Sequence, residues 1–163
     1  YDRSKELIVQ SNFRAMSNQA LMIKREIIVD HHLTMVPGAV GQDTLFFHLM
    51  LIHCKHVKVV DLDIHIYYAG IRTSTVNSIS KCFYEKYLPL EKERVRLFQE
   101  EGLLKEYANR RFPHYFHKWY MEKYKSIQLE DAAESKEILQ SIYEMYAPYI
   151  EVDLDPEILE FVQ

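Results

Sequence analysis

The sequence predicts a helix-rich α+β fold, and three observations lead to this prediction. The 163 residues include only four glycines and five prolines, which favours helices over a many-stranded sandwich. Two β-branched and aromatic runs, at residues 57–60 and 64–68, predict a small sheet. From Lys81 onward, Tyr, Leu, Lys and Glu recur at helical spacing. We therefore expect two parts, a sheet-containing part at residues 1–80 and a helical extension at residues 81–163.

The first part is expected to contain one buried helix beside the sheet. Residues 22–29 predict a short helix or a strand-to-helix passage, and an irregular loop follows over residues 30–41. Residues 44–53 are apolar on most sides of a helix, which is typical of a buried helix. The two predicted strands come next, with Asp61-Leu62-Asp63 between them.

The second part is expected to be a series of helices. Helical periodicity predicts them over residues 76–101, 103–124 and 134–146. Pro89 is expected to kink the first of these helices, and Pro113 to interrupt the second. Asp155-Pro156 predicts a short terminal helix, with Asp155 as N-cap and the proline at the first helical position.

Composition excludes several classes of protein. The formal net charge is −4, so no broad basic field exists to attract nucleic acid. The two cysteines form no CxxC pair, which argues against a disulfide scaffold and fits a reducing compartment. No run of eighteen apolar residues predicts a transmembrane segment. Because the chain opens on Tyr1 without a signal-peptide core, we expect a piece of a larger protein.

The most informative stretch is Gly41-Gln42-Asp43-Thr44-Leu45-Phe46-Phe47, where an acidic residue lies at the passage from loop to helix. Exposed N–H groups and the helix dipole stabilise a carboxylate in the first helical turn. Such a group can accept a proton from a hydroxyl as that hydroxyl attacks. Asp43 is therefore the candidate general base. The other interpretation, an ordinary acidic residue at a helix start, remains open.

A longer pattern resembles a known family. Lys24-Arg25-Glu26, the stretch at residues 41–47, the run at residues 57–61, and Ile66-Tyr67-Tyr68 followed by Arg72 and Ser74 come in this order. The pattern covers about residues 15–80 and resembles the C-terminal, acceptor-side part of bacterial family 2 glycosyltransferases with the GT-A fold. The resemblance implies the acceptor half of a GT-A domain followed by a variable helical extension.

The resemblance also implies roles for four residues. Asp43 matches the base that deprotonates the acceptor hydroxyl for in-line displacement of a nucleoside diphosphate with inversion. Gln42 stands where the family usually has Glu, and would bind the acceptor or orient the base. Arg72 and Ser74 would bind the diphosphate of the donor, since a guanidinium and a hydroxyl both suit phosphate oxygens.

A divalent metal, Mg²⁺ or Mn²⁺, is implied for the intact enzyme, with ligands mostly outside this chain. The metal-binding Asp-x-Asp and the uridine pocket of the family would precede Tyr1, so this piece alone is expected to be inactive and metal-free. Asp61-Leu62-Asp63 has the Asp-x-Asp pattern, but it follows the candidate base, whereas the metal motif of the family precedes it.

The implied partners are a nucleotide-sugar donor and a hydroxyl acceptor on a glycan, teichoic acid or protein, as in the synthesis of cell-surface polysaccharides. Nucleic acid is not expected. The implied location is the cytoplasm, or the inner face of the membrane as a peripheral protein. An exposed docking face for the missing half could also drive an artificial dimer.

Two other functions remain open. A non-catalytic helical module could bind a partner protein through aromatic residues that otherwise form a core or a sugar platform, namely Tyr107, Phe112, Tyr115, Phe116, Trp119, Tyr120 and Tyr124. A metal-dependent hydrolase could use Asp61 and Asp63 with His56 or His65. The pairs His31-His32 and His53/His56 lack the further ligands of a zinc site. No metal site is therefore assigned.

Overall fold

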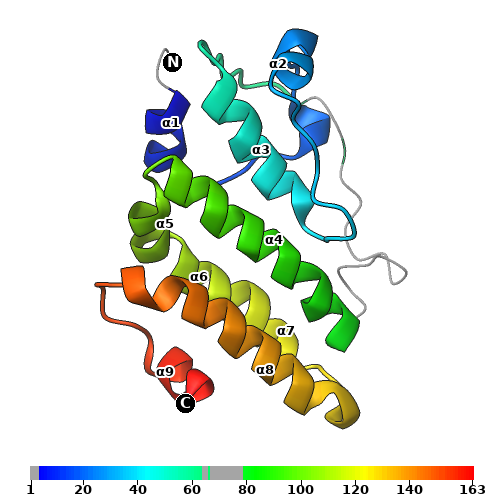
Figure 1. Ribbon diagram of the computed structural model, residues 1–163, viewed down its shortest axis with the longest axis vertical. Coiled ribbons are helices and arrows are strands. Elements are labelled where there is room, and N and C mark those ends of the chain that lie inside the picture. The colour runs from blue at the N-terminus through cyan, green and yellow to red at the C-terminus, as the bar shows by residue number, and fades with distance from the viewer. Residues whose placement is uncertain (1–3, 64–65, 67–78) are drawn as a thin grey trace. The chain divides into compact units, whose positions relative to one another are not determined.

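The computed structural model describes residues 4–63, 66 and 79–163 (Figure 1). The chain divides into two compact units. Unit 1 contains residues 1–37 and 41–69, and unit 2 contains residues 38–40 and 70–163. Within the described ranges, the secondary structure is entirely helical. None of these helices is both long enough and apolar enough to cross a bilayer.

The predicted α+β fold with a small sheet is wrong. Residues 57–60 belong to no strand, and the side chains of Val59 and Val60 are 57% and 51% exposed. A β-branched run favours a strand chiefly through packing against neighbouring strands. No described residue supplies such a neighbour. Of the second predicted strand, only Ile66 is described, and it lies outside any strand. Residues 64, 65, 67 and 68 fall outside the described ranges.

Unit 1 is built around one apolar helix. Its elements are α1 (Ser4–Gln10), η1 (Asn18–Ala20), α2 (Arg25–Asp30) and α3 (Gln42–His53). Helix α3 contacts both α1 and α2. Ile8 of α1 is fully buried, and so, to within a few per cent, are Leu45, Met50 and Leu51 of α3. The prediction of a buried helix at residues 44–53 is thus confirmed. Of the two alternatives predicted for residues 22–29, the short helix is observed, as α2.

Unit 2 is a helical bundle. Its elements are α4 (Lys81–Glu100), α5 (Leu104–Arg110), α6 (Phe112–Tyr115), the π-helix η3 (Phe116–Met121), α7 (Glu122–Tyr124), α8 (Leu129–Tyr146), η4 (Ala147–Tyr149) and α9 (Pro156–Val162). The three predicted tail helices are confirmed as helical regions where they are described. Helix α4 runs through Pro89, and α8 begins five residues earlier than predicted.

Hydrogen bonds show in which direction the helices of unit 2 run relative to one another. At the first turns of α4 and α8, the Lys81 N–H donates to Asp131 Oδ2 at 3.1 Å. The two long helices therefore start together and run side by side in the same direction (Figure 1). The α5–α7 stretch returns along them, because Tyr84 near the start of α4 donates to the Tyr120 carbonyl oxygen at 3.2 Å.

The core of unit 2 is aromatic. Tyr84, Phe98, Phe116 and Tyr120 are fully buried, and the rings of Phe112 and Tyr146 stack with their centroids 4.0 Å apart. Four members of the aromatic set predicted in the tail, namely Tyr107, Phe112, Phe116 and Tyr120, lie in this core with 3% exposure or less. For these four, the core interpretation is confirmed over the sugar platform.

An ion pair lies inside that core. Glu91 and Arg94 of α4 are 0% and 2% exposed and form a direct salt bridge. The hydroxyls of Tyr120 and Tyr146 donate to the two carboxylate oxygens of Glu91, at 2.6 and 2.7 Å. Burial, and then the Glu91 charge, raise the pKa of both tyrosines. Because the buried charges are paired and hydrogen-bonded, the pair ties α4 to η3 and α8.

Candidate functional site

Asp43, the predicted base, lies in the first turn of α3 with its side chain exposed. Asn18 of η1 donates through Nδ2 to Asp43 Oδ1 at 3.4 Å. This contact joins residues 25 positions apart in the chain. A carboxylate can accept several hydrogen bonds. The Asp43 side chain therefore contacts Asn18 and still has oxygen lone pairs that face solvent.

The turn that carries Asp43 is held in place from both sides. Before it, Gly41 has a φ of 69°, a left-handed conformation that glycine adopts at little cost. The Thr44 hydroxyl donates to the Gly41 carbonyl oxygen at 3.1 Å. After it, Leu45 and Phe47 are buried. A carboxylate on such an anchored first turn benefits from the exposed N–H groups of the helix start.

The structure brings two of the four predicted site residues together. Gln42 occupies the first position of α3, half-buried and next to Asp43. Arg72 and Ser74 lie outside the described residues. The candidate site therefore consists of Gln42 and Asp43 with Asn18, which the sequence did not single out. A contact across 25 residues has no local sequence signal, so only the fold could find it.

The alternative metal residues of unit 1 do not form a three-ligand group in the described chain. Asp61 and Asp63 are exposed in a non-helical segment, and His56 is exposed as well. His65 falls outside the described residues. The rings of His31 and His53 stack with centroids 4.1 Å apart. No described residue joins them as a third ligand.

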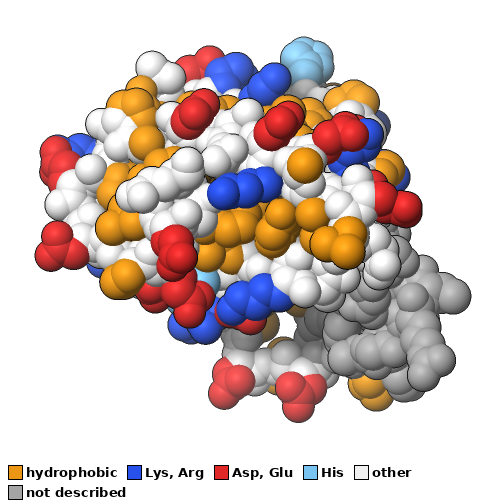
Figure 2. Space-filling model, turned by 90° about the horizontal axis from the view of Figure 1, so that it is seen from below, with side chains coloured by type: hydrophobic (Ala, Val, Ile, Leu, Met, Phe, Trp, Pro, Cys, Tyr) orange, Lys and Arg blue, Asp and Glu red, His pale blue; other side chains and the backbone are white. Residues whose placement is uncertain are grey.

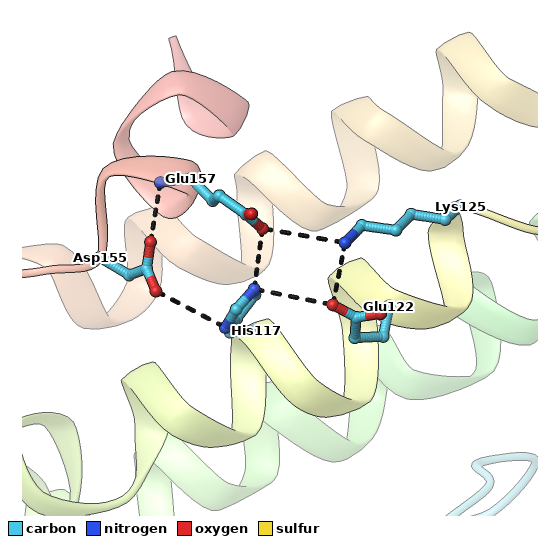
Figure 3. A network of polar contacts seen from close by, with 5 residues as sticks. All are labelled: His117, Glu122, Lys125, Asp155 and Glu157. Atoms are coloured by element: carbon cyan, nitrogen blue, oxygen red, sulfur yellow. Dashed lines mark hydrogen bonds and ion pairs between the residues drawn. The ribbon is translucent and has the colours of Figure 1, made fainter.

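A separate cluster lies in unit 2, where η3 and α7 meet the start of α9 (Figure 3). His117 Nε2 is 3.0 Å from Glu157 Oε2 and 3.8 Å from Glu122 Oε1. On the other side of the ring, Nδ1 is 3.9 Å from Asp155 Oδ2. Lys125 Nζ lies 2.9 Å from Glu122 Oε1 and 3.8 Å from Glu157 Oε2. One imidazole thus stands among three carboxylates and one ammonium group.

The charges of this cluster act on one another. The hydrogen bond from Lys125 and its positive charge lower the pKa of Glu122, and the reciprocal hydrogen bond raises the pKa of Lys125. Glu122, Lys125, Asp155 and Glu157 are all more than 40% exposed, whereas the His117 side chain is only 15% exposed. The imidazole therefore lies beneath a charged and solvated rim.

Sequence reasoning did not single out this cluster. His117 and Glu122 are five residues apart, and in an α-helix that spacing turns the second residue about 140° away from the first. The π-helix reduces that angle through its wider i→i+5 turn, and the Glu122 N–H donates to the His117 carbonyl oxygen. A π-helix has no sequence signal of its own in the predicted helical run, so the pairing was not foreseeable.

Comparisons with protein-family models, with curated protein sequences and with solved structures find no match for this chain.

Proposed function

We propose that the chain is part of an inverting glycosyltransferase in which Asp43 is the general base. The observation that carries the proposal is the position of Asp43, exposed on the first turn of a buried helix and contacted by Asn18 at 3.4 Å. A general base must be accessible to the hydroxyl that it deprotonates and must be held in one orientation. Asp43 is exposed, and its contact with Asn18 favours one orientation of the carboxylate.

In the proposed reaction, Asp43 accepts the proton of the acceptor hydroxyl while the hydroxyl oxygen attacks the anomeric carbon of the donor sugar. A new C–O bond forms on the face opposite the leaving group. The bond to the nucleoside diphosphate breaks, and the diphosphate leaves with the electron pair, so the configuration at the anomeric carbon inverts. Gln42 is proposed to bind the acceptor or orient Asp43, and Arg72 with Ser74 to bind the diphosphate.

The proposal places the acceptor, a glycan, teichoic acid or protein hydroxyl, at the start of α3. The reaction is proposed to run in the cytoplasm or at the inner face of the membrane. Mg²⁺ or Mn²⁺ would stabilise charge on the departing diphosphate. In the described chain, Asp61 and Asp63 belong to no three-ligand group. No step of the reaction is therefore assigned to a metal held by these two residues.

The sheet expected beside α3 is not present in the described residues, so the fold lends the glycosyltransferase assignment no support. The assignment depends instead on the order of residues 24–26, 41–47 and 57–61 in the sequence and on the setting of Asp43. An activity assay is therefore the decisive kind of test.

The test uses the full-length protein that contains this chain. Release of nucleoside diphosphate is measured with a panel of nucleotide-sugars and hydroxyl acceptors, for the wild type and for Asp43→Asn. Asp61→Asn is the matched control, because Asp61 is also an exposed aspartate of unit 1. We expect Asp43→Asn to abolish nearly all transfer and the control to retain it. A wild type that transfers no sugar, or an Asp43→Asn variant of unchanged rate, would overturn the proposal.

The alternative of a protein-interaction module has less support. Its distinguishing feature is a large exposed apolar patch on the tail helices. In the described part of unit 2, the large exposed hydrophobic side chains are those of Leu129, Val152 and Leu159, which belong to separate segments. Figure 2 shows hydrophobic side chains in several groups on the face that it presents, bordered by charged ones. We therefore retain the glycosyltransferase as the proposed function.

A further inference from the structure

We propose that unit 2 carries a binding site for a divalent transition metal, with His117, Glu122 and Glu157 as ligands and Zn²⁺ as the best-fitting ion. The site is independent of the proposed glycosyltransfer, because all three residues belong to unit 2 and Asp43 belongs to unit 1. Three ligand atoms, one from each residue, lie within 4.8 Å of one another.

The spacing of these atoms suits a first-row metal ion. The nitrogen of His117 lies 3.0 Å from one carboxylate oxygen and 3.8 Å from the other. Two ligand atoms of a tetrahedral zinc ion, each about 2.0–2.2 Å from it, lie about 3.3–3.6 Å apart, so both separations are close to the required spacing. Side-chain rotations would bring the oxygens of Glu122 and Glu157, which lie within 4.8 Å of each other, to the same spacing.

The type of ligand selects the class of metal. An imidazole nitrogen with two carboxylates suits Zn²⁺, and also Mn²⁺ or Fe²⁺, whereas Mg²⁺ and Ca²⁺ prefer oxygen ligands alone. Three protein ligands leave a fourth position for water, the arrangement of an open zinc site. The site therefore distinguishes itself from a general acidic patch by its dependence on His117.

The second nitrogen of His117 provides an independent argument. Metal-binding histidines commonly place their other ring nitrogen against a carboxylate, which fixes the tautomer and the ring orientation. Here Asp155 Oδ2 lies 3.9 Å from Nδ1, an ion-pair distance. The other oxygen of Asp155 accepts the N–H of Glu157 at 2.9 Å. Asp155 thus holds the residue that carries one ligand and places a carboxylate on the Nδ1 side of the imidazole.

The backbone supports the ligands before any ion binds. The π-type bond from the Glu122 N–H to the His117 carbonyl oxygen sets these two side chains on one face of the helix. On the other segment, Ile158 is 2% exposed, and the ring of Phe161 packs edge-on to Tyr124 with centroids 5.1 Å apart. Helix α9 is therefore anchored by Ile158 and Phe161, which follow Glu157, and the metal would join α9 to η3 and α7.

Replacement of Lys125 should strengthen metal binding, whereas replacement of a ligand should weaken it. Its ammonium group contacts the same oxygens of Glu122 and Glu157 that are proposed to bind the metal. A metal bound by these two oxygens would therefore compete with Lys125 for them. If this assignment is correct, Lys125→Met removes a competitor and tightens metal binding, although it removes a residue of the cluster.

The experiment is calorimetric titration of the metal-stripped full chain with ZnCl₂, MnCl₂ and MgCl₂. We expect one zinc per chain, with an affinity at least about 10-fold weaker in His117→Ala, Glu122→Gln and Glu157→Gln, and about 10-fold weaker in Asp155→Asn. Asparagine keeps the N-cap at position 155. Lys125→Met should bind more tightly than the wild type, and Mg²⁺ should give no binding at the site.

Matched controls are available in the same unit. His114→Ala removes an exposed histidine of α6, Glu144→Gln an exposed glutamate of α8, and Lys105→Met an exposed lysine that pairs with Glu151. These three variants should bind zinc as the wild type does. Circular dichroism checks that every variant folds, and Glu122 and Glu157 are exposed enough to be replaced safely. Absent zinc binding, or binding equally weakened by His114→Ala, would overturn the site.

Discussion

The two units of the chain differ in how completely they bury their apolar side chains. Unit 2 contains the fully buried aromatic side chains, together with an ion pair whose partners are 2% exposed or less. Unit 1 contains eight of the eleven large hydrophobic side chains that the described residues expose, namely Met16, Met22, Val29, Met35, Val59, Val60, Leu62 and Ile66. Among the described residues, unit 2 therefore buries its large apolar side chains more completely than unit 1 does.

This difference shows which sequence patterns form their structure with few requirements on the rest of the chain. An amphipathic helix needs only a neighbouring helix to bury its apolar side, and unit 2 supplies such neighbours, most extensively between α4 and α8. A β-branched run also needs a strand beside it for its backbone and side chains. In unit 1 the run at residues 57–60 has no such neighbour among the described residues, and Val59 and Val60 stay exposed.

The largest expected effect concerns the buried ion pair of unit 2. Arg94→Met leaves Glu91 as a buried carboxylate without its cationic partner, and should cost about 3–5 kcal/mol of unfolding free energy. Arg96→Met is the control, because Arg96 pairs with Glu93 and Glu100 at the surface, and should cost at most about 1 kcal/mol. Urea denaturation measures both. Equal costs would show that the buried pair does not distinguish unit 2.

The second effect appears at alkaline pH. Burial raises the pKa of Tyr87 from its ordinary value of 10.0 to about 12. Its stabilising contribution is complete below pH 10 and is lost as the pH rises toward 12, since the unfolded chain ionises first. A rise of two pKa units corresponds to about 2–3 kcal/mol. Denaturation at several alkaline pH values, with the tyrosinate absorbance followed in parallel, should show ionisation of the buried tyrosines together with unfolding.

Burial also raises the pKa of five further tyrosines, namely Tyr84, Tyr107, Tyr115, Tyr120 and Tyr146. All of them belong to unit 2, so the alkaline transition should be that of unit 2. Tyrosinate forming in full before any loss of helical circular dichroism would contradict the description of a closed aromatic core.

A smaller effect is expected at Asn109, which fastens α5 to the segment before α9. Its Nδ2 donates to the Tyr149 carbonyl oxygen at 2.8 Å, and its Oδ1 accepts the Glu151 N–H at 2.6 Å. Asn109→Ala removes these two bonds, together with the bond from Nδ2 to the Lys105 carbonyl oxygen at 2.8 Å, and should cost about 1–2 kcal/mol. Gln140→Ala, which removes a single bond of 3.4 Å to Val162, should cost less. Thermal unfolding compares the two variants, and the reverse order would be inconsistent with the structure.

The smallest effect is expected at an exposed apolar residue of unit 1. Met22 is fully exposed, so Met22→Ser should change the unfolding free energy by no more than about 0.5 kcal/mol. The variant should also leave the helical circular dichroism unchanged. A larger loss of stability would mean that Met22 is covered in solution, and would weaken the contrast between the two units.

Local patterns predicted much of the fold. The Asp155-Pro156 pair predicted α9, and the Asp155 side chain does accept the N–H of Glu157. The apolar stretch at residues 44–53 predicted α3. The sheet was predicted wrongly, because β-branched residues indicate a strand only where a pairing partner exists. The early start of α8 at Leu129 was also missed, since Leu129 is exposed and adds nothing to the apolar stripe.

The candidate sites were harder to predict from the sequence than the helices were. Asp43 could be proposed from the sequence because loop-to-helix position and residue type are local properties, whereas its contact with Asn18 depends on the packing of unit 1. The group of His117, Glu122 and Glu157 depends on a π-helix and on two segments that meet only in the folded chain. Spacing rules for α-helices cannot identify such a group.

The measurement that tests the central claim most directly is the kcat of sugar transfer by the full-length protein carrying Asp43→Asn, together with its affinity for the nucleotide-sugar. Loss of a general base should lower kcat by about 10²–10⁴-fold and leave donor affinity within twofold of the wild type. A kcat close to that of the wild type would contradict the account, and would leave Asp43 as an acidic residue that only stabilises the start of α3.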